Sequence, residues 1–390
     1  MARYDRIASI PAPGRDRAFP AWPALRDLEG RDRDVELGRR VRLRFLALRP
    51  VRRLVHRGVG AVPQESLDRQ IEGIREELGH LAARDPERAR LARFLHQIAK
   101  GTPLAVTTAT LDMGEVIEAA GHLHGAEEYY RTALELADAH GLTPERVVAQ
   151  RLLGRVFRKV GRWEEAVQAY RRASELALEA EDAEQWGRSM DGLAAVHREQ
   201  DQADEARRVY RELLARGREL GDRSLTAMAL TGLCLTEVEA GEFERAVEHG
   251  WAALAHAGDR EQRAAVLRAL GLSFAGVGLY RAAERCHRIV AERTAVAETR
   301  VQALLDLARV AAYAGRAGVA REHLREAVVA ADRHGLRALL SRADELLAEL
   351  ERGAEGEALA GPAVRPPGES TRRIAAEVEA FGATLVPASG

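Results

Sequence analysis

The chain has 390 residues, of which 46% are hydrophobic, so it can bury a large core. Its 59 basic and 60 acidic residues nearly cancel, which excludes a global field that would draw it to nucleic acid or an anionic membrane. The two cysteines lie far apart in helical patterns, which excludes a disulfide framework and favours a cytoplasmic protein. The sequence holds no apolar run of signal-peptide or membrane-span length, so neither export nor membrane insertion is expected.

The first 63 residues are predicted to form an irregular and basic extension. Residues 1–29 contain four prolines and show little periodicity. Residues 39–57 hold apolar residues interleaved with a basic patch and no acidic residue; the patch consists of Arg39, Arg40, Arg42, Arg44, Arg49, Arg52, Arg53 and Arg57. Three roles stay open for this patch: docking on the acidic remainder of the chain, contact with a partner protein, or contact with phosphates of nucleic acid or an anionic lipid surface.

A helical pair is predicted over residues 64–106. Apolar residues recur at steps of four and three from Leu67 to Leu81, which is the pattern of an amphipathic helix. A second helix is expected over residues 86–100, with Pro86 near its first turn. The pair is expected to pack onto the element that follows it. A dimerising coiled coil is the alternative, although three heptads are not reached.

Residues 107–352 are dominated by a motif that recurs about every 40 residues. One copy combines a Leu-Gly pair, an aromatic residue, a turn glycine, and then alanine, an aromatic residue and alanine: Leu153, Gly154, Phe157, Gly161, Trp163, Ala166, Tyr170 and Ala173. The preceding copy holds Gly114, Ile117, Gly121, Ala126, Tyr130 and Ala133, and the following copy Ala194, His197, Asp201, Ala206, Tyr210 and Leu213. Three more copies are marked by Cys234, Gly241, Phe243, Ala246 and Ala253; by Gly271, Phe274, Gly278, Tyr280 and Ala283; and by Ala308, Gly315, Ala320 and Ala327. Copies in constant register indicate stacked supersecondary units.

Each copy is predicted to be a helical hairpin. Small residues such as Gly154 allow two helices to cross closely, and large residues such as Tyr170 fill the space between neighbouring hairpins. A single hairpin cannot bury its apolar face, so stability is shared between neighbours and the array needs capped ends. The turn glycines fall where a helix must stop and reverse, and Asp201 replaces glycine in one copy.

These slots resemble the tetratricopeptide signature, from about Thr107 to Gly335. The resemblance implies an all-α, right-handed superhelical solenoid of about six helix hairpins, with the first helix of each hairpin lining a concave groove. The 37–40-residue unit exceeds the usual length of about 34 and lacks the closing proline. It is therefore more similar to the long-helix variants of bacterial peptide-sensing regulators and motor light chains. The family's chaperone-binding clamp uses asparagine, which this chain lacks, so chaperone docking is not predicted.

A cap helix and a tail are predicted after the last repeat. Leucines over residues 336–352 face away from charged residues, as in a helix that covers the end of a core. Residues 353–390 are predicted to be a flexible tail, because their first half has the proline and glycine content of a linker. One short helix is expected between Ser370 and Phe381.

The predicted groove carries a basic face. Its members share one side of a helix in the second repeat or take comparable slots in the third: Arg151, Arg155, Arg158, Lys159, Arg188 and Arg198. Together they could hold an acidic peptide or a C-terminal carboxylate by charge-assisted hydrogen bonds. The alternative is pairing between repeats, because Glu115 and Glu118 take the equivalent slots in the preceding repeat.

No catalytic residue, cofactor motif or metal site is predicted. His122 and His124 lie in a turn without a cysteine or carboxylate at zinc spacing. The stretch Gly276 to Gly278 has part of a phosphate-loop pattern but lacks a preceding strand. Cys234 and Cys286 are interpreted as core thiols.

Two functions remain open. The first is a non-catalytic scaffold or adaptor that binds a partner peptide or helix, expected to be acidic, in the concave groove. The alternative is a bacterial regulatory protein in which the repeats sense a peptide and the basic N-terminal segment contacts nucleic acid or an anionic membrane. The sequence leaves the partner and the oligomeric state open.

Overall fold

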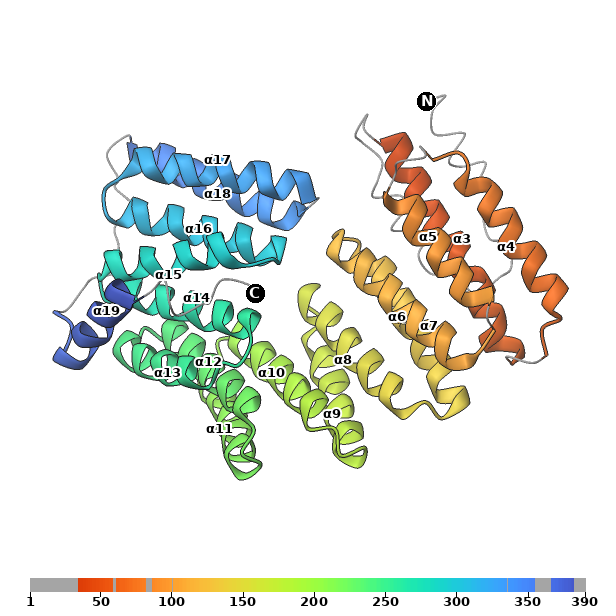
Figure 1. Ribbon diagram of the computed structural model, residues 1–390, viewed down its shortest axis with the longest axis horizontal. Helices are drawn as coiled ribbons and strands as arrows, with labels where there is room; N and C mark the ends of the chain where they lie inside the picture. Colours follow the sequence, from red (N-terminus) through yellow and green to blue (C-terminus); the bar gives the residue numbers. More distant parts are fainter. Residues whose placement is uncertain are drawn as a thin grey trace. The chain divides into compact units, whose positions relative to one another are not determined.

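The computed structural model describes residues 34–58, 61–81, 86–99, 101–334, 336–354 and 366–381. These residues form helices α3 to α19 and contain no strand (Figure 1). The chain divides into two compact units, residues 1–182 and 183–390. Within the described ranges, no helix is both long enough and apolar enough to span a bilayer.

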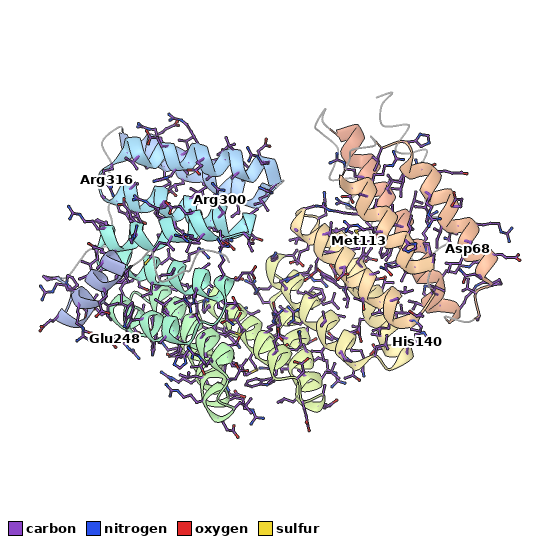
Figure 2. All side chains as sticks on the ribbon, viewed as in Figure 1. Asp68, Met113, His140, Glu248, Arg300 and Arg316 are labelled. Carbon is purple, nitrogen blue, oxygen red and sulfur yellow. The ribbon has the colours of Figure 1, made fainter. Side chains whose placement is uncertain are left out.

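Unit 1 contains three N-terminal helices followed by two hairpins. Its helices are α3 (Asp34–Arg57), α4 (Gln64–Leu78), α5 (Pro86–Ala99), α6 (Pro103–Ala119), α7 (Leu123–His140), α8 (Thr143–Lys159) and α9 (Trp163–Glu179). Helices α3, α4 and α5 pack against one another, and α3 and α5 also pack on the first hairpin, α6–α7. The helix pair expected over residues 64–106 is α4 and α5. Met113 of α6 is buried, whereas Asp68 on α4 is exposed (Figure 2).

The irregular extension expected up to residue 63 is wrong for residues 34–57, which form the continuous helix α3. Its apolar residues return to one side of the helix, where Leu43, Ala47, Val51 and Leu54 are buried. That burial outweighs the backbone hydrogen bond lost at Pro50 inside the helix. Residues 1–33, for which an irregular chain was also expected, lie outside the described residues.

Unit 2 contains four hairpins, a cap helix and a docked C-terminal helix. The hairpins are α10–α11 (Ala183–Glu199, Ala203–Glu219), α12–α13 (Arg223–Glu239, Phe243–His256), α14–α15 (Arg260–Gly276, Tyr280–Arg293) and α16–α17 (Ala297–Tyr313, Ala317–His334). The cap helix α18 (Arg337–Ala354) packs on α17 and α16, and α19 (Glu369–Phe381) packs on α15 and α13. The described part of the chain thus holds six repeat hairpins, and the predicted all-α array is confirmed.

The expected flexible tail contains a helix that is packed in place. The short helix predicted near Ser370 is α19, and its residues Thr371, Ile374, Ala375 and Val378 are buried. The last three belong to the same core cluster as residues of α14 to α17. The remainder of the predicted tail, residues 355–365 and 382–390, lies outside the described residues.

A glycine packed against a ring fills the crossing point of three hairpins, α6–α7, α8–α9 and α14–α15. A Cβ built on Gly114 would lie 2.4 Å from the Tyr130 ring, which no side chain tolerates without a shift, and one on Gly154 would lie 3.0 Å from the Tyr170 ring. In the α14–α15 hairpin a Cβ on Gly271 would lie 2.5 Å from the ring of His287. His287 therefore occupies the slot that holds tyrosine in the earlier repeats.

The hairpin turns explain why glycine recurs at the predicted positions. Gly161, with φ of 76°, adopts the left-handed conformation that ends a helix without a steric penalty. Asp201 replaces glycine in this role and has the same conformation, with φ of 58°. A short polar side chain tolerates this region better than most, so the repeat keeps its turn.

Candidate functional site

The predicted basic face in unit 1 is paired internally. The buried carboxylate of Glu118, on α6, accepts a hydrogen bond from Arg155 at 2.7 Å and contacts the Lys159 ammonium at 2.9 Å, both from α8. The Tyr130 hydroxyl donates to the same carboxylate at 2.8 Å. Arg155 also reaches Glu115 at 3.3 Å. Two helices of successive repeats are thus joined by one carboxylate and two cations.

The electrostatics keep this cluster ionised. Burial opposes the charge on Glu118, but the hydrogen bond and charge of Arg155, together with Lys159, lower the pKa of the carboxyl below its ordinary value. The same contacts raise the pKa of Arg155 against its own burial. Arg151 and Arg158 also have partners within the structure. The arrangement is the pairing between repeats that the sequence left open, and a ligand role for these four cations stays a prediction.

The two remaining groove residues predicted from sequence lie in unit 2 and also have partners. Arg188 pairs with Glu184 one turn earlier on the same helix, at 2.7 Å. Arg198, on α10, donates to Glu239 of the next repeat at 2.9 Å. Their contact with a ligand likewise stays a prediction.

The basic patch on α3 contributes to the packing of unit 1. Arg44 is buried and donates from Nε and Nη2 to the two oxygens of Glu87, at 2.6 and 2.9 Å. This bidentate arrangement is stronger than an arginine–carboxylate pair joined by a single hydrogen bond. Arg52 pairs with Glu128 on α7. These contacts correspond to docking on acidic residues of the remaining chain, one of the three roles left open for the patch.

The other members of the patch differ in their surroundings. Arg40 and Arg49 have partners, Arg42 and Arg53 are half-buried, and Arg57 is exposed. The side chain of Arg39 lies outside the described residues. Contact of the patch with a partner protein, nucleic acid or lipid stays a prediction.

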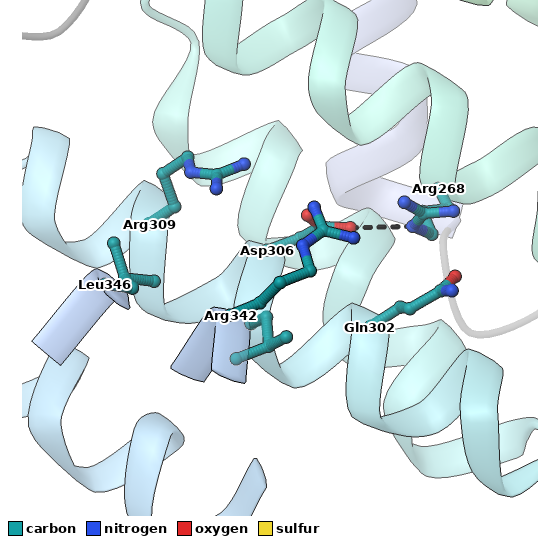
Figure 3. A pocket seen from close by; sticks show the side chains of 7 residues that line it. Arg268, Gln302, Asp306, Arg309, Arg342 and Leu346 are labelled. Atoms are coloured by element: carbon teal, nitrogen blue, oxygen red, sulfur yellow. Dashed lines mark hydrogen bonds and ion pairs between the residues drawn. The ribbon is translucent and has the colours of Figure 1, made fainter. Parts of the chain in front are cut away.

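A cleft in unit 2, hereafter the arginine cleft, brings together residues that the sequence analysis did not single out (Figure 3). It lies between α14 and α16, which are the first helices of the last two hairpins, and the cap helix α18. On α16, Gln302, Asp306 and Arg309 recur at steps of four and three and so share one side of the helix. The complete lining is Arg268, Gln302, Leu305, Asp306, Arg309, Arg342 and Leu346.

Asp306 is the buried anion of the arginine cleft. Arg268 donates from Nε to its Oδ2 at 2.8 Å, and His287 Nδ1 lies 4.0 Å from the same oxygen. Burial opposes ionisation of Asp306, but the charge of Arg268 lowers the pKa of the carboxyl. Burial also lowers the pKa of His287 to about 4, so its ring is neutral at pH 7. Neither ring nitrogen has a hydrogen-bond partner among the described residues.

The arginine cleft has more positive than negative charge. It contains three guanidinium groups and one carboxylate, and that carboxylate is held by Arg268. Arg309, which is half-buried, and Arg342, which is exposed, form no ion pair with any described residue. Their donors and the Gln302 amide line the same space (Figure 3). The enclosed space is only about 10 Å³, about the room that one water molecule needs. A carboxylate would therefore meet these charged donors at the exposed side of the cleft, where Arg342 lies.

The arginine cleft could not be found from the spacing of one segment. Its residues come from positions 268, 302–309 and 342, and only their packing brings them together. The available signal was the polar stripe of Gln302, Asp306 and Arg309 on an otherwise buried first helix. A buried aspartate in a repeat core requires a cation nearby.

The residues that the sequence analysis set aside as catalytic or metal-binding candidates lie in the core or at the ends of helices. Cys234 and Cys286 are free buried thiols, as predicted, and burial raises the pKa of Cys234 to about 12. His124 lies 3.9 Å from Glu127 at the start of α7. Gly278 forms the turn between α14 and α15. The part of the chain that the structure describes holds no group of three or more His, Cys, Asp or Glu side chains placed to bind a metal ion.

Comparison with known proteins identifies the repeat. A tetratricopeptide repeat family model matches residues 106–179. No curated protein sequence matches the chain at a significant level. The fold is similar to that of a Rap protein solved in complex with Competence and Sporulation Factor, at 14% identity and a TM-score of 0.51, covering 88% of this chain and 99% of that chain.

Two structures of the quorum sensor NprR are also similar. NprR in complex with its cognate peptide NprX has 15% identity and a TM-score of 0.47, covering 86% of this chain and 97% of that chain. The apo form from B. thuringiensis has 14% identity and a TM-score of 0.44, covering 80% and 85%. The fold, the matched segment and the six hairpins define a helical solenoid of the tetratricopeptide class. Residues 106–179 match the tetratricopeptide repeat family, and no catalytic family is identified for the chain.

Proposed function

We propose that this protein is a non-catalytic regulator that binds a partner peptide on the first helices of its repeats, with an acidic group of the peptide in the arginine cleft. The observation that carries the proposal is the pair Arg309 and Arg342, which face one cleft without an ion pair among the described residues. The chain has a fold similar to that of a Rap protein that was solved in complex with Competence and Sporulation Factor. This similarity supports a regulator that binds a factor over a general scaffold. A scaffold would use the same surface for a larger partner.

Hydrogen bonds from the arginines of the cleft would stabilise a negatively charged group of a ligand. A hydrogen bond to a charged group contributes about 1.5–3 kcal/mol when well formed, and solvent reduces that value at the exposed Arg342. The cleft already contains a carboxylate that holds Arg268 in position. Less ordering is therefore required when the ligand binds. Leu305 and Leu346 add apolar surface beside the donors.

The basic face of unit 1 is a second proposed contact. Its cations Arg151, Arg155, Arg158 and Lys159 all have partners within the structure. Because Arg155 and Lys159 are already held by Glu118, their contribution to ligand binding is expected to be smaller than that of the cleft. Contact of the α3 patch with nucleic acid or membrane is not part of the proposal, since Arg44 and Arg52 serve packing.

The proposal is tested by selecting, from a displayed library of random peptides, those that bind the full-length protein. Enriched peptides are expected to contain Asp, Glu or a free C-terminal carboxylate at a fixed position. Their affinity, measured by fluorescence anisotropy, should fall at least about 10-fold in R309E/R342E, because two charged contacts are lost. The matched control is R300E, since Arg300 lies on the same helix (Figure 2). It does not line the cleft and pairs with Glu326 of α17. Failure to enrich any peptide, or equal affinity for all three proteins, would refute the assignment.

A further inference from the structure

Helix α19 covers a surface that the repeats would otherwise leave open. It follows the cap helix in sequence, yet it packs on α13 and α15, two and one hairpins before the last (Figure 1). Both are second helices of their hairpins, whereas the arginine cleft lies on first helices and the cap. The surface under α19, hereafter the α13–α15 surface, is therefore distinct from the proposed peptide site.

The contact has the pattern of a helix bound in a groove. Thr371, Ile374, Ala375 and Val378 recur at steps of three, one and three and form one buried side. Arg372, Arg373 and Glu379 lie on the exposed side. This spacing is how an amphipathic helix binds a preformed apolar groove.

A hydrogen bond at the start of α19 and charged residues near its end suit the observed direction of the helix. At its start the Gly368 amide donates to the Glu244 carboxylate of α13 at 2.6 Å. Towards its end Glu379 shares a depression with Arg281, Arg285 and Arg288 of α15. Glu284 also lines this depression but pairs with Arg316. The three arginines thus lie around the acidic end of α19.

We propose that the α13–α15 surface is a docking surface for an amphipathic helix of a partner protein, and that α19 is its resident occupant. The partner helix has small or β-branched residues at the four buried positions and acidic residues near its C-terminal end, the chemistry that α19 itself displays. An isolated helix of 13 residues is marginal in water. Helix α19 therefore depends on the surface to stay folded, and a competing helix of the same pattern replaces it.

Binding of a labelled peptide of residues 366–381 to the full chain tests this proposal. In the native chain the tethered α19 competes at an effective concentration in the millimolar range, so the added peptide should bind weakly. The variant I374D/V378D should release α19 and bind the peptide at least about 10-fold more tightly, since the tethered competitor is removed. The control R372A/R373A changes only the exposed side of α19 and should behave as the native chain. Equal binding to native chain and I374D/V378D, or no binding to either, would overturn the proposal.

Two further measurements remove the remaining ambiguities. If I374D/V378D does not fold, hydrogen exchange on the native chain replaces it: amides of α19 should exchange faster than those of α13 and α15, and equal protection would overturn the proposal. A native dimer that disappears in I374D/V378D would assign the surface to a second copy of the chain, which also overturns the partner assignment. The I374D/V378D variant should keep the library-selected peptides bound, so failure here is distinct from failure of the arginine cleft.

Discussion

The basic face of unit 1 and the arginine cleft of unit 2 both place cations around a buried carboxylate, but they differ in how many of those cations the carboxylate binds. Glu118 receives Arg155, Lys159 and the Tyr130 hydroxyl, so its contacts join two repeats. Asp306 accepts a hydrogen bond from Arg268, and the charge of Arg309 also acts on it, while Arg309 and Arg342 form no close ion pair among the described residues. Clustered cations can therefore serve to join repeats, as they do around Glu118. For this reason we place the proposed ligand contact at cations that form no ion pair among the described residues.

Removal of the carboxylate in unit 1 is expected to have the largest effect on folding. The substitution E118A leaves Arg155, Lys159 and Tyr130 without their common acceptor. We expect a loss of about 2–4 kcal/mol, less than for a fully buried pair because both cations are partly exposed. Urea unfolding measures this loss. A change below about 0.5 kcal/mol would mean that the cluster does not hold the two repeats together.

Unit 2 is expected to lose stability in acid through His287. The pKa of this ring is lowered to about 4 in the folded chain by burial, with Asp306, Arg268 and Arg309 as its charged neighbours. The unfolded chain therefore binds the proton first as pH falls below about 6.5. Stability from this group is complete above that pH and decreases towards pH 4, by up to roughly 3 kcal/mol at about 1.4 kcal/mol per pKa unit.

The variant H287F isolates this effect, because an aromatic ring suits the slot that holds tyrosine in earlier repeats. Urea unfolding of both proteins between pH 7 and 4.5 gives the comparison. The stability difference between native chain and H287F should shift in favour of the variant as pH falls. A difference that stays constant over this range would exclude His287 as a buried neutral group.

Removal of the carboxylate in unit 2 should lower the stability of the fold less than E118A does. It should also strengthen the binding of acidic peptides. The isosteric change D306N leaves one partly exposed guanidinium, Arg268, without its partner. We expect a loss of about 1–2 kcal/mol in urea unfolding. Acidic peptides should bind several-fold more tightly, because the cleft gains one net positive charge. Weaker binding in D306N would show that Asp306 contacts the ligand directly or that the cleft is not its site.

The repeat array was predictable because its signals are local and repeated. Gly154 with Tyr170 and the turn at Gly161 each lie within one unit of sequence, and every copy repeats the same sizes in the same slots. Stacking then follows, since each hairpin exposes apolar surface until a neighbour covers it. The pairing of Glu118 with Arg155 was an open alternative for the same reason: equivalent slots of successive repeats lie side by side.

Other features depend on tertiary packing and were not predictable. Helix α3 was expected to be irregular because Pro50 and the many arginines obscured its apolar side, and its partner Glu87 lies on another helix. The arginine cleft joins three helices, and the sequence gives no sign that Arg155 forms a close ion pair while Arg309 forms none with a described residue. The docked position of α19 depends on a surface built more than 100 residues earlier, where Glu244 lies.

The most direct test of the account measures one selected acidic peptide against both cation clusters of the full chain by fluorescence anisotropy, with circular dichroism to confirm folding. Substitution of the cleft arginines in R309A/R342A should reduce the affinity at least about 10-fold. Substitution of the paired cations in R155A/K159A should change it by less than about 3-fold, because those side chains already satisfy Glu118. The reverse order of effects in folded proteins would place the ligand on unit 1 and contradict the account.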